Sequence, residues 1–324
     1  MKSSHHRIFS RRTLLAGSAV SFVGLTVSRM VLAAQSDSPA AGASGAVRTD
    51  KSLAGKTALV TGSTDGLGRE AALQLASRGA HVLIHGRNRE RGAAAVDEIK
   101  AAHGNATFYA ADLSSLVEVR KLAAAVLRDH PRIELLINNA GIGSVDRSGG
   151  RAREVSADGH ELRFAVNYLS GYLLTKLLLP TLVESAPARV VNVASLGQRA
   201  IDFDNVMLER EYDGSRAYSQ SKLAQIMFTI DLARELQGKN VTANSLHPAT
   251  YMDTSMVRSA GVEPRSTVAE GADAAMYVAT SPQLTGKTGL FFNGKQETRA
   301  NAQAYDEAAR AKLRELSEKL TSAT

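Results

Sequence analysis

The chain has 324 residues, enough for one large α/β domain with a sizeable core or for two small domains. It contains no cysteine, which excludes disulfides and thiolate metal sites. The formal net charge of +7 does not indicate a nucleic acid or other polyanion as a partner, because residues 1–33 hold five basic residues and no acidic one, leaving the remainder near neutrality.

Residues 1–33 have the pattern of a bacterial export signal. The sequence SRRTLL at residues 10–15 resembles a twin-arginine signal, and a mildly apolar run follows to Val31. Ala33 gives a plausible cleavage point, and Arg29 interrupts the apolar run, so we expect no stable membrane span after cleavage. Export to the periplasm is therefore expected. The alternative is a disordered basic tail, which would leave the protein in the cytoplasm.

Residues 34–50 are rich in alanine, serine and glycine and are interpreted as a flexible linker, so the folded domain is expected at residues 51–324. The apolar run Lys56–Thr61 is typical of a buried parallel strand, and it leads directly into a glycine-rich turn and a helical pattern. Glycines let a backbone approach a pyrophosphate, and a helix amino terminus offers free N–H groups to it. The expected cofactor contacts of this turn are Gly62, Ser63, Asp65, Gly66, Leu67 and Gly68.

The next strand, His81–His85, predicts which dinucleotide binds. Arg87 follows it and lies nineteen residues past Gly68, where the residue beside the adenosine ribose is expected. An acidic residue there would hold the free 2′-hydroxyl of NAD, whereas arginine suits the extra phosphate of NADP. We therefore predict NADP(H), with NAD(H) as the less favoured cofactor; a solvated arginine is the alternative interpretation. His81 and His85 are interpreted as structural, and we expect no metal site.

Further strands and helices alternate along the chain, with strands expected at 106–111 and 133–137 and a helix at 116–127. This alternation predicts an α/β fold: a single doubly wound Rossmann-type domain with a mostly parallel sheet and helices on both faces. Residues that follow these two strands are expected to contact the cofactor. They are Asp112, Leu113, Asn139, Ala140 and Gly141.

The second half of the domain carries polar residues at positions where ligands bind. Asn167 lies in a long apolar helix expected at 163–179, and a buried amide there is either a satisfied core residue or part of a proton or water path. Ser195 ends the strand expected at 189–195, but no Gly-x-Ser-x-Gly elbow surrounds it, so it is expected to hydrogen-bond a substrate oxygen. The strand at 241–246 leads to His247, interpreted as structural, and to Pro248, which fixes a loop that could close over a nicotinamide.

Tyr218 and Lys222 are four residues apart, so on a helix they share one face. A phenol loses its proton near pH 10, and a nearby ammonium group is expected to lower that pKa. The pair could therefore act as a general acid/base near neutral pH. Alone, this spacing fits a half-buried tyrosine beside a solvated lysine better; its context in the chain favours catalysis.

Five features in this order resemble the short-chain dehydrogenase/reductase family: the glycine-rich turn, the Asn-Asn-Ala-Gly sequence at 138–141, Asn167, Ser195 and the Tyr218/Lys222 pair. The resemblance covers about residues 54–320, and residues 203–222 resemble the retinol-dehydrogenase-like branch. It implies that Tyr218 transfers a proton and that Ser195 orients the substrate oxygen. It also implies that Lys222 lowers the tyrosine pKa and holds the nicotinamide ribose, while Asn167 anchors a water. Ala249 departs from the glycine that many relatives carry after the proline.

We therefore expect an NADP(H)-dependent oxidoreductase acting on a small-molecule alcohol or carbonyl, with the cofactor held tightly during export. A non-catalytic dinucleotide-binding or interaction protein on the same fold is the alternative, and a homo-oligomer is left open. Apolar residues flanking the expected site favour a lipophilic substrate, although core packing would explain some of them equally well. They are Ile201, Phe203, Val206, Met207, Tyr251, Met252, Met256 and Val257.

Overall fold

The computed structural model describes residues 50–144 and 152–322, so the predicted export signal and nearly all of the predicted linker lie outside the described residues. The strands span Thr57–Val60 (β1), His81–Gly86 (β2), Asn105–Ala110 (β3), Leu135–Asn138 (β4), Ala188–Val193 (β5), Val241–His247 (β6), Phe291–Asn293 (β7) and Gln296–Thr298 (β8). The helices span Gly66–Ser77 (α1), Arg89–Ala101 (α2), Leu116–Asp129 (α3), Leu162–Phe164 (α4), Ser170–Glu184 (α5), Gly214–Glu235 (α6), Ser255–Ser259 (α7), Val268–Thr280 (α8) and Glu307–Ser322 (α9).

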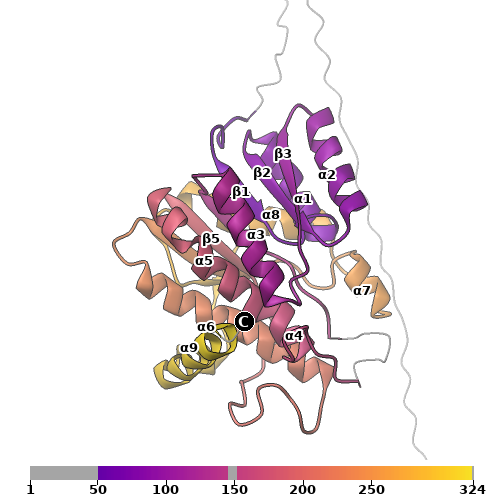
Figure 1. Cartoon of the computed structure of the whole chain (residues 1–324), viewed down its shortest axis with the longest axis vertical. Coiled ribbons are helices and arrows are strands. Elements are labelled where there is room, and N and C mark those ends of the chain that lie inside the picture. The colour runs from indigo at the N-terminus through magenta and orange to yellow at the C-terminus, as the bar shows by residue number, and fades with distance from the viewer. Residues whose placement is uncertain (1–49, 145–151, 323–324) are drawn as a thin grey trace, which may run out of the picture. The chain divides into compact units, whose positions relative to one another are not determined.

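The described strands form one eight-stranded sheet in the order β3-β2-β1-β4-β5-β6-β7-β8 (Figure 1). Neighbouring strands from β3 to β7 are parallel, and only β8 runs antiparallel to its neighbour. The strand order reverses between β1 and β4, and doubly wound sheets bind their ligands in the crevice at such a point. The predicted mostly parallel, doubly wound α/β fold is confirmed.

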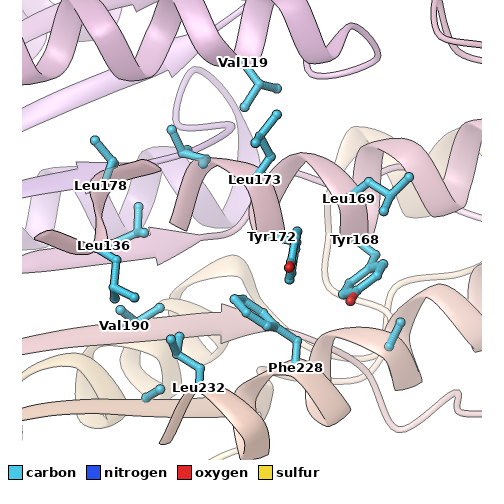
Figure 2. Packing of buried hydrophobic residues seen from close by; sticks show 14 of the residues in the cluster. Val119, Leu136, Tyr168, Leu169, Tyr172, Leu173, Leu178, Val190, Phe228 and Leu232 are labelled. Carbon is cyan, nitrogen blue, oxygen red and sulfur yellow. The ribbon is translucent and has the colours of Figure 1, made fainter. Parts of the chain in front are cut away.

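Helices cover both faces of the sheet because successive side chains of each strand point to opposite faces. On β1, Ala58 and Val60 join the hydrophobic cluster under α1, α2 and α8, whereas Leu59 joins the cluster under α3, α5 and α6. Figure 2 shows the second cluster, where Tyr172 of α5 packs edge-to-face on Phe228 of α6 with ring centroids 5.0 Å apart. The two clusters hold the strand ends, and the loops that leave them, in fixed positions.

The long helix α6 brings the tyrosine–lysine pair to the carboxyl edge of the sheet. It begins after Asp213, whose carboxylate accepts a hydrogen bond from the backbone N–H of Arg216 and so caps the helix amino terminus. Leu223, Ala224, Ile226 and Met227 pack into the core, and α9 lies against the same helix. The face that carries Tyr218 and Lys222 is thereby turned toward the ends of β4 and β5.

Two predicted elements differ from the structure. The helix expected at 163–179 is interrupted by one π-helical turn at Ala165–Leu169, which contains Asn167; such turns occur often at functional sites. The sequence from Gly286 to Asn293 predicts a last strand, but only Phe291–Asn293 forms one. Gly294, at φ +60°, then turns the chain into the unpredicted strand β8. In the described ranges, we find no helix with both the length and the apolar character needed to cross a membrane.

Candidate active site

The glycine-rich turn between β1 and α1 is packed too closely to carry side chains. Gly62 has a left-handed φ of +65°, and a Cβ built on it would lie 2.9 Å from the Cα of Ala140. A Cβ built on Gly68 would lie 2.2 Å from the carbonyl oxygen of Gly62. The two glycines therefore form a cradle that a side chain would fill, at the amino terminus of α1, which fits the pyrophosphate of a dinucleotide.

The predicted residues Asn139 and Ala140 support this turn. The Nδ2 group of Asn139 donates to the carbonyl oxygens of Thr61 at 2.8 Å and Gly62 at 3.1 Å. The backbone N–H groups of Asn139 and Ala140 both donate to Oγ1 of Thr61 at 3.0 Å. The loop after β4 and the glycine-rich turn are thus joined into one unit.

A substitution at Gly68 tests this cradle. We expect Gly68→Ala to weaken dinucleotide binding strongly, because the new methyl group must displace either the Gly62 carbonyl or the amide of Asn139, 2.4 Å from the built Cβ. The measurement is a fluorescence titration with NADPH, alongside urea unfolding. Gly238→Ala is the control, since a Cβ there meets nothing within 4 Å, although its φ of +79° costs some stability. Unchanged NADPH affinity in folded Gly68→Ala would contradict the cradle.

Four other predicted cofactor residues have side chains that are buried or bonded to the protein's own backbone. Ser63 is fully buried, and its hydroxyl donates to the carbonyl of Val60. Leu67 and Leu113 are buried in the two hydrophobic clusters, so only their backbone groups can face a ligand. Asp65 is exposed; its carboxylate accepts from the backbone of Gly66 at 2.7 Å.

Arg87 lies at the carboxyl end of β2 with its side chain 70% exposed. Its guanidinium lies 3.9 Å from the carboxylate of Asp112, at the end of β3, so the two predicted residues border one edge of the crevice. Arg91, on the first turn of α2, adds a second guanidinium there, 3.6 Å from the carboxylate of Asp65. Arg91 was not predicted from the sequence as a residue of this edge. The signal that could have identified Arg91 is its position four residues after Arg87.

Ser195 and Tyr218 both lie beside Gly197. The Ser195 hydroxyl oxygen accepts from the backbone N–H of Gly197 at 3.0 Å, and its proton is donated toward the hydroxyl of Tyr218. A Cβ built on Gly197 would lie 3.4 Å from that oxygen and 3.7 Å from Cε1 of Tyr218. Gly197 thus lies against both the Ser195 hydroxyl and the ring of Tyr218.

Lys222 is buried, and its ammonium group donates to the carbonyl oxygen of Val193 at 2.9 Å and to Oε1 of Gln225 at 3.0 Å. Burial lowers the pKa of Lys222 to about 7. Gln225 was not predicted from the sequence as a partner of Lys222, although the two residues are three apart on the same helix face.

The expected lowering of the Tyr218 pKa is not what the structure shows. Burial raises the pKa of Tyr218, and a hydrogen bond from Ser195 offsets this only in part. The Lys222 nitrogen lies 5.7 Å from the centre of the tyrosine ring and is directed toward backbone and amide oxygens. Desolvation of the phenol therefore has the largest effect on its pKa.

Asn167 holds the loop after β4 against α6. Its Oδ1 accepts from the backbone N–H of Ile142 at 2.7 Å, and its Nδ2 donates to the Ile142 carbonyl at 3.2 Å and to Ser221 Oγ at 3.0 Å. A Cβ built on Gly141 would lie 3.2 Å from Asn167 Oδ1 and 3.4 Å from Lys222 Nζ. The structure therefore brings Gly141, Asn167 and Lys222 together beside Tyr218.

The loop after β6 reaches back over the glycine-rich turn. Pro248 is buried at the start of this loop, and the His247 ring nitrogen Nε2 is bonded to the hydroxyl of Thr250 at 3.0 Å, which supports a structural role for the histidine. A Cβ built on Gly66 would lie 3.3 Å from the methyl group of Thr254. The loop thus lies where a nicotinamide-side contact is expected.

The predicted apolar flank divides into core and surface. Ile201 and Val206 are only 4% and 6% exposed and belong to the hydrophobic core, so they offer almost no surface to a substrate. Tyr251 and Met256 remain exposed near the loop after β6. Leu196, directly after Ser195, is also exposed and was missed because it follows the expected strand. Within the described part of the chain, no three His, Asp or Glu residues are grouped to hold a metal ion.

Known proteins are similar to this chain over most of its length. A family model described as short chain dehydrogenase matches residues 56–264. Human retinol dehydrogenase 13 is 35% identical over 291 residues, covering 83% of this chain and 85% of that protein. Human retinol dehydrogenase 14 is 36% identical over 294 residues, covering 82% and 85%.

Solved structures extend the likeness to the fold. An uncharacterised protein from Mycobacterium paratuberculosis has a TM-score of 0.67 and 30% identity, covering 83% of this chain and 94% of its own. The Pseudomonas aeruginosa RhlG/NADP active-site complex has a TM-score of 0.61 and 30% identity, covering 76% and 96%.

Proposed function

Because this chain belongs to the short-chain dehydrogenase/reductase family, in its retinol-dehydrogenase-like branch, and is therefore an oxidoreductase, we propose that it interconverts a lipophilic alcohol and its carbonyl with NADP(H). One observation carries the proposal: the Ser195 hydroxyl and the Tyr218 ring lie together beside Gly197, and the buried ammonium of Lys222 lies 5.7 Å from the centre of that ring. This set lies at the sheet edge that also carries the glycine cradle.

Each residue has a role that follows from its contacts. Ser195, whose oxygen already accepts from Gly197, donates its proton to the substrate oxygen and fixes its position. Tyr218 gives a proton to that oxygen in reduction and removes it in oxidation. Lys222 supplies positive charge beside the phenol, and Asn167 holds the adjoining loop in place. The nicotinamide, when bound, supplies or accepts the hydride.

Three observations support a lipophilic substrate. Leu196 on the loop after β5, Tyr251 on the loop after β6 and Met256 on α7 are exposed apolar residues. Met256 also packs on the loop after β4, since a Cβ on Gly143 would lie 3.2 Å from its Cγ. The curated relatives are named retinol dehydrogenases.

The function is tested by steady-state turnover with NADPH on matched aldehydes, from long-chain or polyene compounds to small polar ones. We expect kcat/KM to rise with the apolar area of the substrate. Turnover restricted to small polar hydroxy acids or their keto forms would contradict the lipophilic assignment. The absence of turnover on every carbonyl and alcohol, with dinucleotide bound, would favour a non-catalytic protein.

Arg87 is proposed to select NADP(H) by contacting the 2′-phosphate. We expect Arg87→Leu to weaken NADPH binding by about tenfold to a hundredfold, the usual effect of losing a charge-assisted hydrogen bond, while NADH affinity changes little. Calorimetric titration of both dinucleotides measures this. Arg128→Leu is the matched control, because Arg128 is 71% exposed against 70% for Arg87 and lies at the far end of α3. An equal loss of NADPH and NADH affinity in Arg87→Leu would contradict the selection.

We also propose that the protein is exported in folded form with its cofactor bound. The support is the SRRTLL sequence at residues 10–15 together with the apolar run that follows. In a bacterial host with this export route, we expect the wild-type protein in the periplasm and the Arg11→Lys/Arg12→Lys variant in the cytoplasm. Exported protein should release NADP(H) on denaturation. Identical fractionation of the two proteins would contradict the twin-arginine assignment.

A further inference from the structure

His85 lies near the carboxyl end of β2 and is 2% exposed. Its Nδ1 is 3.1 Å from the backbone nitrogen of Gly62, and its Nε2 is 3.2 Å from the carbonyl oxygen of Ala111. A backbone N–H can only donate and a carbonyl can only accept, so Nδ1 is unprotonated and Nε2 carries the proton. One neutral tautomer of His85 satisfies both neighbours.

The main chain of His85 joins the same turn. Its N–H donates to Ser63 Oγ at 2.9 Å, and its carbonyl accepts from the N–H of Ser63, also at 2.9 Å. With the ring contact to Gly62, three hydrogen bonds connect this residue to the glycine-rich turn. A Cβ on the adjacent Gly86 would lie 2.6 Å from the side chain of Thr64, so the turn also packs directly on the end of β2.

The position of His85 is central to the dinucleotide site. Three segments contact the proposed cofactor on this side: the turn at 62–68, Arg87 after β2, and Asp112 after β3. His85 is bonded to the first, lies two residues before Arg87 in the chain, and is bonded to the residue that precedes Asp112. Within the described residues, we find no other side chain with hydrogen bonds to both the turn and the end of β3.

We propose that His85 is a positioning residue for the dinucleotide: its neutral ring fixes the glycine-rich turn, the Arg87 segment and the Asp112 segment in the arrangement that binds NADP(H). This role rests on the proposed function. The N–H of Gly62 is engaged by His85, so the phosphates are left with the N–H groups at the start of α1. Burial lowers the pKa of His85 to about 4, so the neutral ring is the form present at pH 7.

Removal of the His85 ring is expected to weaken NADPH binding and to leave kcat almost unchanged. If the ring is removed, the N–H of Gly62 loses its partner, and the turn spends less time in its binding conformation. The apparent dissociation constant rises by the inverse of the competent fraction. We therefore expect His85→Leu to raise the dissociation constant of NADPH by about tenfold or more, with kcat at saturating NADPH within about twofold of wild type.

Three variants and one control separate the two ring contacts. His85→Asn places Oδ1 near the position of Nδ1, so it should bind NADPH almost as tightly as wild type. His85→Gln reaches toward Ala111 instead, so its NADPH affinity should be closer to that of His85→Leu. His81→Leu is the control, because His81 lies on the same face at the other end of β2 and is bonded to Thr107. NADPH titration, urea unfolding and steady-state kinetics are measured for each. Nitrogen-15 spectra of the wild-type imidazoles should show the Nε2-protonated tautomer of His85.

Several outcomes would overturn the proposal. Wild-type affinity in a folded His85→Leu protein would do so, as would equal losses in His85→Leu and His81→Leu, which would indicate a general effect on β2. A protonated Nδ1 at pH 7 would remove its structural basis. If His85→Leu does not fold, wild-type affinity in both His85→Asn and His85→Gln would overturn it equally. A wild-type protein that binds neither NADPH nor NADH would instead remove the proposed function itself, and this role with it.

Discussion

Replacing Tyr218 by phenylalanine is expected to lower kcat by about a hundredfold to ten-thousandfold, the usual contribution of a positioned general acid/base. The substitution deletes only the phenol oxygen, so the ring keeps its place beside Gly197 and Lys222. NADPH affinity and the free energy of unfolding should change little. The measurement is steady-state reduction of a lipophilic aldehyde with saturating NADPH.

A second tyrosine provides the control for this loss. Tyr277 is on α8, on the opposite face of the sheet, and its hydroxyl donates to the side chain of Gln283 at 3.3 Å. Tyr277→Phe should therefore retain wild-type kcat. If Tyr218→Phe keeps more than about a tenth of wild-type kcat, the proton is transferred by another group and the proposed role of Tyr218 is wrong.

Arg163 and Glu161 form a buried ion pair that is expected to contribute strongly to stability. Arg163 and Glu161 are 1% and 0% exposed, and their charged groups lie 3.6 Å apart. Arg163 also donates to the carbonyl of Gly143 at 3.0 Å and to the hydroxyl of Tyr212 at 2.6 Å. The pair thus ties α4 to the loop after β4 and to the segment that precedes α6.

Arg163→Ala is expected to lower the free energy of unfolding by about 3–5 kcal/mol, because it leaves the Glu161 carboxylate buried without its cation. Urea unfolding measures the change. Tyr212→Phe, which removes one hydroxyl, should cost about 1 kcal/mol. The double variant Glu161→Leu/Arg163→Met should regain much of the loss, since apolar residues replace both charges. If the double variant is no more stable than Arg163→Ala, the loss reflects packing and not an unpaired charge.

Most of the fold could be predicted from the sequence because the pattern of each element is local. The apolar strand before Gly62 and the helical pattern after it predict β1 and α1, and the repetition of such units predicts the parallel order. The grouping of the candidate catalytic residues could be predicted from the same local patterns. Ser195 follows a strand, and Tyr218 and Lys222 share a helix face, so the fold alone brings them to one edge of the sheet.

What the sequence could not predict depends on contacts between distant segments. The π-helical turn contains Asn167, whose side-chain amide is hydrogen-bonded to both backbone groups of Ile142, twenty-five residues earlier. The direction in which the Tyr218 pKa shifts depends on how deeply the folded chain buries the phenol and on its hydrogen bond with Ser195. The role proposed for His85 could not be predicted, because its partners, Gly62 and Ala111, come together only across the finished sheet.

We propose that this site moves a hydride between NADP(H) and a carbonyl carbon, with the proton supplied by Tyr218. The most direct test is product analysis by mass spectrometry after reduction of a lipophilic aldehyde with NADPH deuterated at C4 of the nicotinamide. With wild-type protein and the cofactor labelled on the transferred face, we predict one deuterium on the carbinol carbon, and only trace product with Tyr218→Phe. Alcohol product without deuterium from either labelled face, or equal product from both proteins, would contradict the account.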